Sequence, residues 1–183
     1  MVSLADLWLP ILLSAVLVFV ASSIIHMALR WHSSDFKRFP NENGVMDALR
    51  PFNLPPADYV APLPESMAHM NSPEFKAKQA RGPSFTLTML VSTSIGRNLV
   101  KWFLYSILIA VFAAYVASLT LPAGAPYMIV FRVTSTVTFA AYALALWQNW
   151  IWYSRSLGYT VRTTIDGLIY ALLTGGAFGW LWP

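Results

Sequence analysis

Two histidines and two carboxylates follow one another across the end of the first apolar stretch of the chain. His26, His32, Asp35 and Glu42 form the pattern H-x5-H-x2-D-x6-E. Imidazole and carboxylate groups together are ligands for zinc, iron, manganese or copper, so a divalent transition metal is a candidate cofactor. The spacing matches no HExxH motif. The alternative is a hydrated junction in which Asp35 and Glu42 pair with nearby basic residues. His69 is a weaker further candidate.

A carboxylate inside the last apolar stretch, Asp166, is a candidate proton or cation site. Ionisable groups within the hydrocarbon are costly and usually face the bundle interior with a partner. If the stretches cross a membrane, His26 reaches a similar depth, and a His26–Asp166 pair would hold a proton near neutral pH. The alternatives are Asp166 paired with Arg162, one helical turn earlier, and His26 bonded to backbone or water at headgroup level.

Arg132 is the third polar group that the apolar stretches must accommodate. It falls on the opposite half of the membrane from Asp166, so the two cannot pair within one chain. A lone arginine near a span end is a snorkelling anchor or a contact for an anion or lipid headgroup.

Four long apolar stretches must position these groups, in a chain of 183 residues that is 57% hydrophobic. About 20 residues suffice to cross a hydrocarbon core as a helix. The sequence therefore predicts an all-α membrane protein, one transmembrane domain over residues 1–183. The predicted spans are Leu7–Leu29, Leu99–Leu119, Tyr127–Trp150 and Val161–Trp182.

The distribution of charge predicts an orientation. Most of the 12 Lys and Arg residues lie in the segment 30–97, and the segment between the third and fourth spans carries Arg155 and Arg162. Neither terminus nor the 120–126 link carries any. Positively charged loops stay cytoplasmic, so we expect both termini outside, in the periplasm, and 30–97 in the cytoplasm.

The cytoplasmic segment 30–97 is rich in proline and is expected to form a cap on the bundle. Asn43 is expected to cap a short helix that ends at Arg50. Ser72 and Pro73 predict the start of a second helix, which Gly82-Pro83 would stop. Residues 51–64 should be extended, and Phe85–Ile95 is expected to lie in the interface or re-enter the membrane.

Rows of small residues predict close helix packing. Ala110 and Ala114 lie one turn apart in the second span, and Gly175 and Gly179 form a GxxxG pair in the fourth. Both rows suit packing within one chain or between copies in a homo-oligomer.

Several function classes lack support in the sequence. There is no cysteine, so disulfides and thiolate metal sites are excluded. No phosphate-binding glycine loop, nucleophile elbow or catalytic triad spacing occurs. No basic run suggests nucleic acid, and an anionic lipid surface is the expected partner of the basic loops.

Five segments resemble a bacterial family of small four-span membrane proteins to which no activity is assigned. The resemblance implies a bacterial inner-membrane location and lends no catalytic residues. The segments are Leu7–Ala15, Ala21–Met27, Trp31–Asp35, Pro40–Glu42 and Phe178–Pro183.

Three functions fit these observations. The first is a non-enzymatic structural or accessory membrane protein that self-associates or joins other membrane subunits. The second is an oligomeric channel or carrier for a small ion, with His26 and Asp166 at the cytoplasmic mouth and Arg132 at the outer one. The third is a membrane metalloprotein that uses His26, His32, Asp35 and Glu42. The sequence leaves open whether the protein is an enzyme, although non-enzymatic roles fit it better.

Overall fold

The computed structural model describes residues 2–91 and 93–183. Met1 and Ser92 lie outside the described residues, and Ser92 falls within the predicted segment Phe85–Ile95. The chain divides into two compact units. The first comprises Met1–Lys37 and Ser94–Pro183, and the second comprises Arg38–Thr93.

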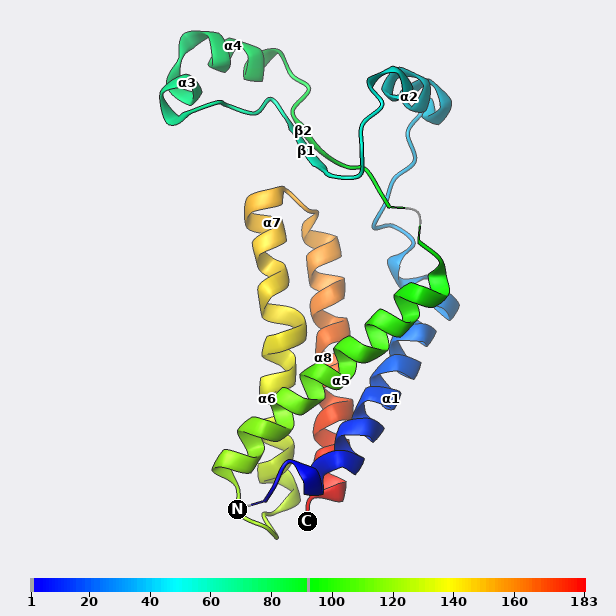
Figure 1. The fold of residues 1–183 in the computed structure, drawn as a ribbon, viewed down its shortest axis with the longest axis vertical. Coiled ribbons are helices and arrows are strands. Elements are labelled where there is room, and N and C mark those ends of the chain that lie inside the picture. Colours follow the sequence, from blue (N-terminus) through cyan, green and yellow to red (C-terminus); the bar gives the residue numbers. More distant parts are fainter. Residues whose placement is uncertain (1, 92) are drawn as a thin grey trace. The chain divides into compact units, whose positions relative to one another are not determined.

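The first unit is a bundle of four long helical segments (Figure 1). All four are long and apolar enough to cross a membrane, which confirms the prediction of four long apolar helices. The first, Ala5–Ala28, contains a short 3₁₀ turn, α1 (Trp8–Ser23) and a π-helical turn (Ile24–Ala28). The others are α5 (Ile95–Thr120), the segment Tyr127–Tyr153, and α8 (Leu157–Leu181). The segment Tyr127–Tyr153 consists of α6 (Tyr127–Ala143), a 3₁₀ turn (Leu144–Leu146) and α7 (Trp147–Tyr153).

Helix α5 begins four residues before the predicted start, because Ser94 caps it. The Ser94 hydroxyl accepts a hydrogen bond from the Arg97 backbone N–H at 3.3 Å, a standard way to satisfy a free N–H of the first turn. Hydropathy alone could not detect this polar first turn.

Both termini and the α5–α6 turn lie at one end of the bundle (Figure 1). The Gly124 N–H donates to the Pro183 carbonyl at 2.6 Å, and the Trp182 indole N–H donates to the Pro122 carbonyl at 2.9 Å. Close by, Leu7 packs in one buried cluster with Phe178. An even number of spans requires this shared end.

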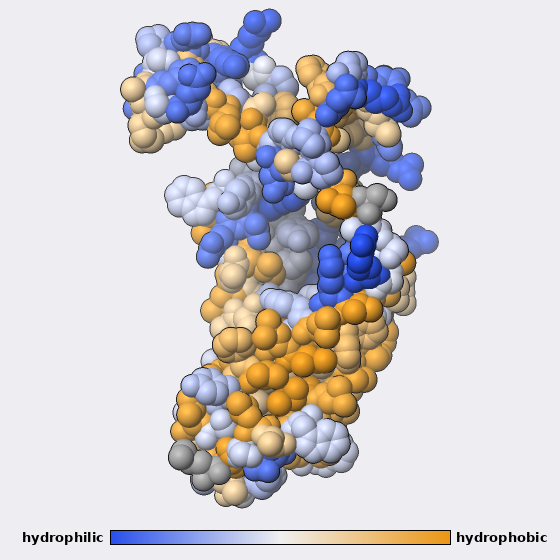
Figure 2. All heavy atoms as spheres, viewed as in Figure 1, coloured by the Kyte–Doolittle hydropathy of each residue, from blue (hydrophilic) through white to orange (hydrophobic). Residues whose placement is uncertain are grey.

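The bundle places small side chains inside and bulky apolar ones outside. On α5, Ala110, Ala114 and Ala117 are buried, whereas Leu104 and Phe112 are more than half exposed. Figure 2 shows the resulting hydrophobic surface over the bundle. A soluble protein would not leave so much contiguous apolar surface in water, and in a bilayer lipid tails cover it.

Helices α6 and α8 approach most closely where α8 carries glycine. A Cβ added at Gly175 would lie 3.0 Å from the Phe131 carbonyl oxygen, and one added at Gly179 would lie 2.8 Å from the Tyr127 ring. Gly167 makes a similar approach, since an added Cβ would lie 2.9 Å from the Ala143 Cβ. The GxxxG pair therefore packs α8 against its own neighbour within the chain.

The described residues of the second unit form three short α-helices, a 3₁₀ turn (Arg50–Phe52) and a two-stranded antiparallel ribbon. The ribbon pairs β1 (Asp58–Ala61) with β2 (Phe85–Thr88). The chain is thus mainly rather than entirely α-helical, and the first four residues of the segment Phe85–Ile95 form a strand. Residues 85–88 contain two threonines and a phenylalanine, which favour a strand, and pairing with the extended proline-flanked segment satisfies their backbone groups.

The helices of the second unit start at capping side chains. Helix α2 (Glu42–Leu49) is capped by Asn41 rather than by the predicted Asn43, because the Asn41 side chain accepts from the Gly44 N–H at 3.0 Å. Helix α4 (Pro73–Arg81) begins after Ser72 as predicted and ends at Gly82. A further helix, α3 (Met67–Asn71), was not predicted.

Candidate functional site

The end of the first span folds back on itself and stacks two histidine rings. The π-helical turn Ile24–Ala28 is closed by a hydrogen bond from the Leu29 N–H to the Ile24 carbonyl at 2.9 Å. Leu29 is extended, at φ −87° and ψ 139°, so the helix ends there. The next turn, Arg30–His32, returns His32 to His26, with ring centroids 4.5 Å apart. Single π-helical turns are rare and often mark functional sites.

His32 links two carboxylates that are far apart in sequence. Its Nδ1 lies 2.5 Å from Asp35 Oδ2, and its Nε2 lies 2.8 Å from Asp166 Oδ2 on α8. An ionised carboxylate only accepts hydrogen bonds. Two protons must therefore be shared along this chain, either both on the His32 ring or one on the ring and one on a carboxyl group.

Asp35 is fixed between His32 and a guanidinium. Its second oxygen accepts from Arg162 Nε at 2.8 Å and from Arg162 Nη2, and only 3% of its side chain is exposed. Burial acts to raise the pKa of the Asp35 carboxyl, but the hydrogen bonds and charges of His32 and Arg162 outweigh it, so the pKa is held below its usual value. Asp35 is therefore a carboxylate at neutral pH.

The tautomer of His26 follows from its partner. Its Nδ1 lies 3.0 Å from the Ser22 backbone carbonyl oxygen, which can only accept, so Nδ1 carries the proton. The lone pair of a neutral His26 ring is then on Nε2. Histidines that bind metals usually have this arrangement, with the second ring nitrogen donating to a carbonyl or carboxylate.

One carboxylate oxygen of Asp166 is hydrogen-bonded to His32, and the other is buried with no partner among the described residues. Its side chain is 4% exposed, and Oδ1 forms no hydrogen bond there. One turn further along α8, the buried Tyr170 hydroxyl is also without a partner in the described part of the chain. A buried unsatisfied oxygen costs about 1–3 kcal/mol, more if charged, so Asp166 Oδ1 is suited to meet an ion or a water.

Three groups in this cluster could hold a metal ion together. One ring nitrogen from each of His26 and His32 and a carboxylate oxygen of Asp166 all lie within 4.8 Å of one another. Tetrahedral ligands about 2.0–2.1 Å from zinc are separated by about 3.3 Å, so the three atoms must draw closer together to bind one ion. The two imidazole rings, which are stacked at an interplanar angle of 12°, must also rotate. The ion would take the place of the proton between His32 and Asp166.

The structure brings some of the predicted residues together and separates others. Asp166 binds His32 rather than His26, and Arg162 binds Asp35 rather than Asp166. The backbone partner expected for His26 is present.

Glu42 and His69 belong to the second unit. Glu42 lies in the first turn of α2, and the His69 ring packs edge-on against Phe75 in the same unit.

Arg132 lies far from this cluster. It is exposed on α6, eleven residues before Ala143, and at 1.5 Å per residue that is about 16 Å along the helix axis. Ala143 faces Gly167, the residue next to Asp166. The structure therefore places Arg132 near the end that contains the termini, exposed on the surface of the bundle.

Sequence reasoning missed the pairing of Asp35 with Arg162 and the central position of His32. The only local signal was the three-residue spacing of His32 and Asp35, which suits contact within one turn. Residue Arg162 lies 127 positions from Asp35, and no pattern in the sequence indicated that contact.

No protein-family model matches the chain, and searches of curated proteins and of solved structures found no match either. The resemblance to a bacterial four-span family therefore stays a prediction, and the function has to be argued from the geometry of the site.

Proposed function

We propose that this integral membrane protein binds a divalent transition metal ion through His26, His32 and Asp166. The observation that carries the proposal is the convergence of one ligand atom from each residue within 4.8 Å. Two histidines and one carboxylate form the protein ligand set of zinc sites with an open position and of iron(II) facial triads. Either ion suits these ligands.

The surroundings of the ligands support the proposal. His26 Nδ1 is held by the Ser22 carbonyl and His32 Nδ1 by Asp35, so Nε2 is the ring nitrogen that each histidine has left for the ion. Asp35 is held in turn by Arg162. Carboxylates that orient metal-binding histidines in this way usually contribute about 10–100-fold to metal affinity.

Metal titration of the purified chain tests the proposal. Protein stripped with a chelator and then titrated with Zn²⁺ or Co²⁺ should take up one ion per chain, and Co²⁺ should give visible absorption bands. His26→Ala, His32→Ala and Asp166→Asn should each lose this ion. Binding of less than about 0.1 equivalent by the wild type would overturn the proposal, since a site of this kind holds its metal tightly.

Two variants serve as matched controls. His69→Ala removes the third histidine of the chain, and Glu42→Gln removes the fourth ligand predicted from sequence. Neither residue belongs to the group of His26, His32 and Asp166, so both variants should bind the ion as the wild type does. Equal loss of metal in His69→Ala and His26→Ala would mean that the ion is bound elsewhere.

A second candidate is a proton-coupled carrier for a small ion. It is favoured by the position of His32 between Asp35 and Asp166, because such a chain can take up or release a proton. It predicts a flux in liposomes that collapses in Asp166→Asn. Metal-free protein with an undiminished, His32-dependent flux would favour the carrier over the metal site.

A structural or accessory role with self-association stays a proposal. The small residues that suggested it are used within the chain, since Gly175 and Gly179 contact α6, and Ala110 and Ala114 are buried in the bundle. An oligomer would have to use other surfaces. Native mass spectrometry in mild detergent distinguishes a monomer from a homo-oligomer or a complex with other subunits.

The bacterial inner membrane is the proposed location, with both termini in the periplasm. The support is the excess of Lys and Arg in the 30–97 segment. Because the chain has no cysteine, single cysteines report orientation directly. Ala123→Cys should react with an impermeant maleimide in intact cells, and Lys78→Cys only after lysis; the reverse pattern would invert the topology.

A further inference from the structure

Three buried polar atoms in the interior of the bundle have no hydrogen-bond partner among the described residues. They are Asp166 Oδ1 and the Tyr170 hydroxyl on α8, and Thr138 Oγ1 on α6. The three residues are between 0% and 3% exposed, so bulk water does not reach them. Buried polar groups are almost always hydrogen-bonded, and exceptions often mark a place where water or an ion binds.

Other buried hydroxyls of α5 and α6 do have partners on their own helices. The Thr134 hydroxyl donates to the Val130 carbonyl at 2.8 Å, and the Ser106 hydroxyl donates to the Trp102 carbonyl at 3.0 Å. Thr138 lies one turn after Thr134 and makes no such bond to a carbonyl of α6. Its hydroxyl is therefore available to a partner that lies between the helices.

The packing of α6 against α8 brings Thr138 level with the unpartnered tyrosine of α8. A Cβ added at Gly167 would lie 3.3 Å from the Tyr142 Cβ, and one added at Gly175 would lie 3.0 Å from the Ser135 Cβ. The two helices therefore run antiparallel. Thr138 lies between Ser135 and Tyr142 at spacings of three and four residues, which place all three on one face of α6. Thr138 thus faces the stretch of α8 between the two glycines, which contains the tyrosine.

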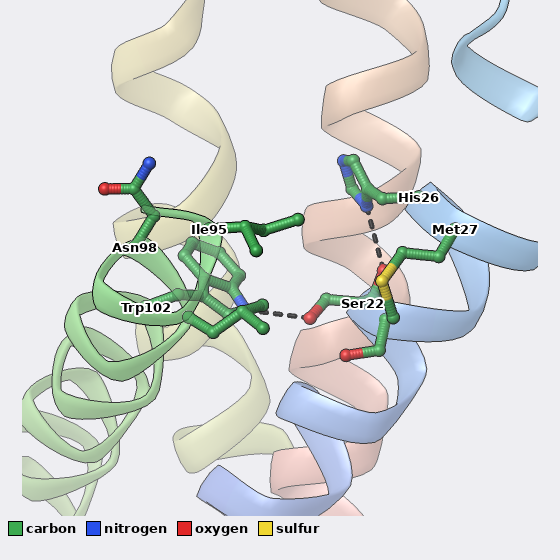
Figure 3. Close-up of a pocket in the computed structure, with 8 residues that line it drawn as sticks. Ser22, His26, Met27, Ile95, Asn98 and Trp102 are labelled. Atoms are coloured by element: carbon green, nitrogen blue, oxygen red, sulfur yellow. Dashed lines mark hydrogen bonds between the residues drawn. The ribbon is translucent and has the colours of Figure 1, made fainter. Parts of the chain in front are cut away.

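Tyr170 is held in the interior by two aromatic rings and lies close to Asp166. Its ring centroid is 5.3 Å from that of Tyr142 and 6.0 Å from that of Trp102. Trp102 is itself fixed, since its indole N–H donates to Ser22 Oγ at 2.7 Å (Figure 3). Asp166 lies one turn before Tyr170 on α8, and the two polar groups are near enough to interact electrostatically. They form no direct hydrogen bond, so a small polar molecule between them would satisfy both.

Water meets the hydrogen-bonding needs of all three atoms. A carboxylate oxygen accepts hydrogen bonds, whereas the hydroxyls of tyrosine and threonine both donate and accept. A water molecule donates two hydrogen bonds and accepts two, and buried waters usually bond to about three polar groups. Water is also neutral, whereas a cation at this place would repel the proposed metal ion. Water is therefore the occupant that fits best.

We infer that ordered water inside the bundle joins Asp166 Oδ1 to the hydroxyls of Tyr170 and Thr138. Tyr170 is then a positioning residue, because the water holds Oδ1 while Oδ2, which lies 2.8 Å from His32 Nε2, is left for the ion. The positioning role rests on the proposed metal function, whereas the water site does not. Partners that orient a ligating carboxylate usually contribute about 10–100-fold to metal affinity.

X-ray radiolysis of the purified protein in nanodiscs tests the water site. The beam turns water into hydroxyl radicals, so side chains beside ordered water are oxidised even when they are buried, and mass spectrometry measures the rate at each residue. Tyr170 should be oxidised faster than Tyr142, although the two residues are 3% and 8% exposed, an order that favours Tyr142. Thr138→Val, which replaces the hydroxyl with a methyl group, should slow the oxidation of Tyr170. Oxidation of Tyr170 no faster than that of Tyr142 would overturn the water site.

Cobalt binding tests the positioning role. Tyr170→Phe removes only the hydroxyl and should weaken Co²⁺ binding about ten-fold, with visible absorption bands shifted from those of the wild type. Tyr142→Phe is the matched control, because Tyr142 is buried in the same aromatic cluster, and this variant should bind Co²⁺ as the wild type does. Equal affinity of the wild type and Tyr170→Phe, or equal losses in both variants, would overturn the positioning role.

The two experiments separate the failure of this inference from the failure of the metal site. Co²⁺ binding by the wild type, with Tyr170 oxidised no faster than Tyr142, overturns the inference and leaves the metal site standing. Faster oxidation of Tyr170 in a protein that binds no Co²⁺ retains the water site and overturns both the metal site and the positioning role.

Discussion

Replacing Asp35 with asparagine should destabilise the bundle, because Asp35 holds the end of the first span to α8. Its carboxylate accepts hydrogen bonds from His32 Nδ1, Arg162 Nε and Arg162 Nη2. Asparagine retains one acceptor oxygen, places an NH₂ group against one of these donors and leaves Arg162 without its counter-charge.

The expected cost follows from the burial of the pair. Removing one partner of a fully buried ion pair costs about 3–5 kcal/mol. Asp35 is only 3% exposed, but Arg162 is 23% exposed and can reach water, which lowers the penalty. We therefore expect a loss of about 2–3 kcal/mol in the free energy of unfolding.

Unfolding in mixed micelles titrated with SDS, followed by circular dichroism, measures this loss. Asp47→Asn is the matched control, because Asp47 and Arg50 form a similar pair whose side chains are 64% and 68% exposed. Exposed pairs contribute about 0–1 kcal/mol, so the control should change little. The double variant Asp35→Asn/Arg162→Gln should lose less than the sum of the two single variants.

The stability difference between wild type and Asp35→Asn should also depend on pH, and this dependence tests whether the difference is electrostatic. The pKa of Asp35 is lower in the folded protein than in the unfolded chain, so its contribution is complete above the unfolded value of about 3.9. It disappears as the pH falls through the lowered folded value. The difference between wild type and Asp35→Asn should therefore shrink below about pH 4. A difference under about 0.5 kcal/mol at pH 7, or one that persists undiminished at lower pH, would refute the ion-pair account.

Three further experiments test the packing. Gly175→Val should cost at least about 1–3 kcal/mol through overlap with the Phe131 carbonyl. Gly176→Ala, whose added Cβ comes no closer than 3.9 Å to Tyr127, should cost nothing and can gain up to about 1 kcal/mol in helix propensity; similar losses from both would argue against the α6–α8 contact. Gly96→Ala should raise stability by up to about 1 kcal/mol, since nothing lies within 4 Å of the added Cβ, and a loss would indicate contacts beyond these. Trp102→Phe should cost about 0.5–1.5 kcal/mol by removing the hydrogen bond to Ser22, and the same substitution in a Ser22→Ala background should cost less. All three are measured by the same SDS titration.

The spans could be predicted from sequence because they depend on composition over about 20 residues. Their ends could not, because single contacts decide them. Ser94 caps the start of α5 by accepting a hydrogen bond from the Arg97 N–H. Leu29 ends the first span by adopting an extended backbone after a π-helical turn. Neither event leaves a trace in a hydropathy profile.

The sequence indicated which residues belong to the candidate site, but it did not indicate which of them contact one another. His26, His32, Asp35 and Asp166 were all identified from residue type and position. Their contacts depend on the rotation of α8 about its axis and on the reversal at Leu29, and both are set by packing throughout the bundle. Glu42 was included because it is near in sequence. It lies in the second unit, and its role as a ligand stays a prediction.

The contact between His32 and Asp166 joins residues 134 positions apart, so it cannot exist until the last span has been synthesised. Helix α8 is the least apolar of the four and carries both Arg162 and Asp166. Its partners for these charges, His32 and Asp35, lie more than 120 positions earlier in the chain. They are therefore synthesised before α8, so groups already present favour the insertion of this helix, and formation of the site requires α8 to be in place.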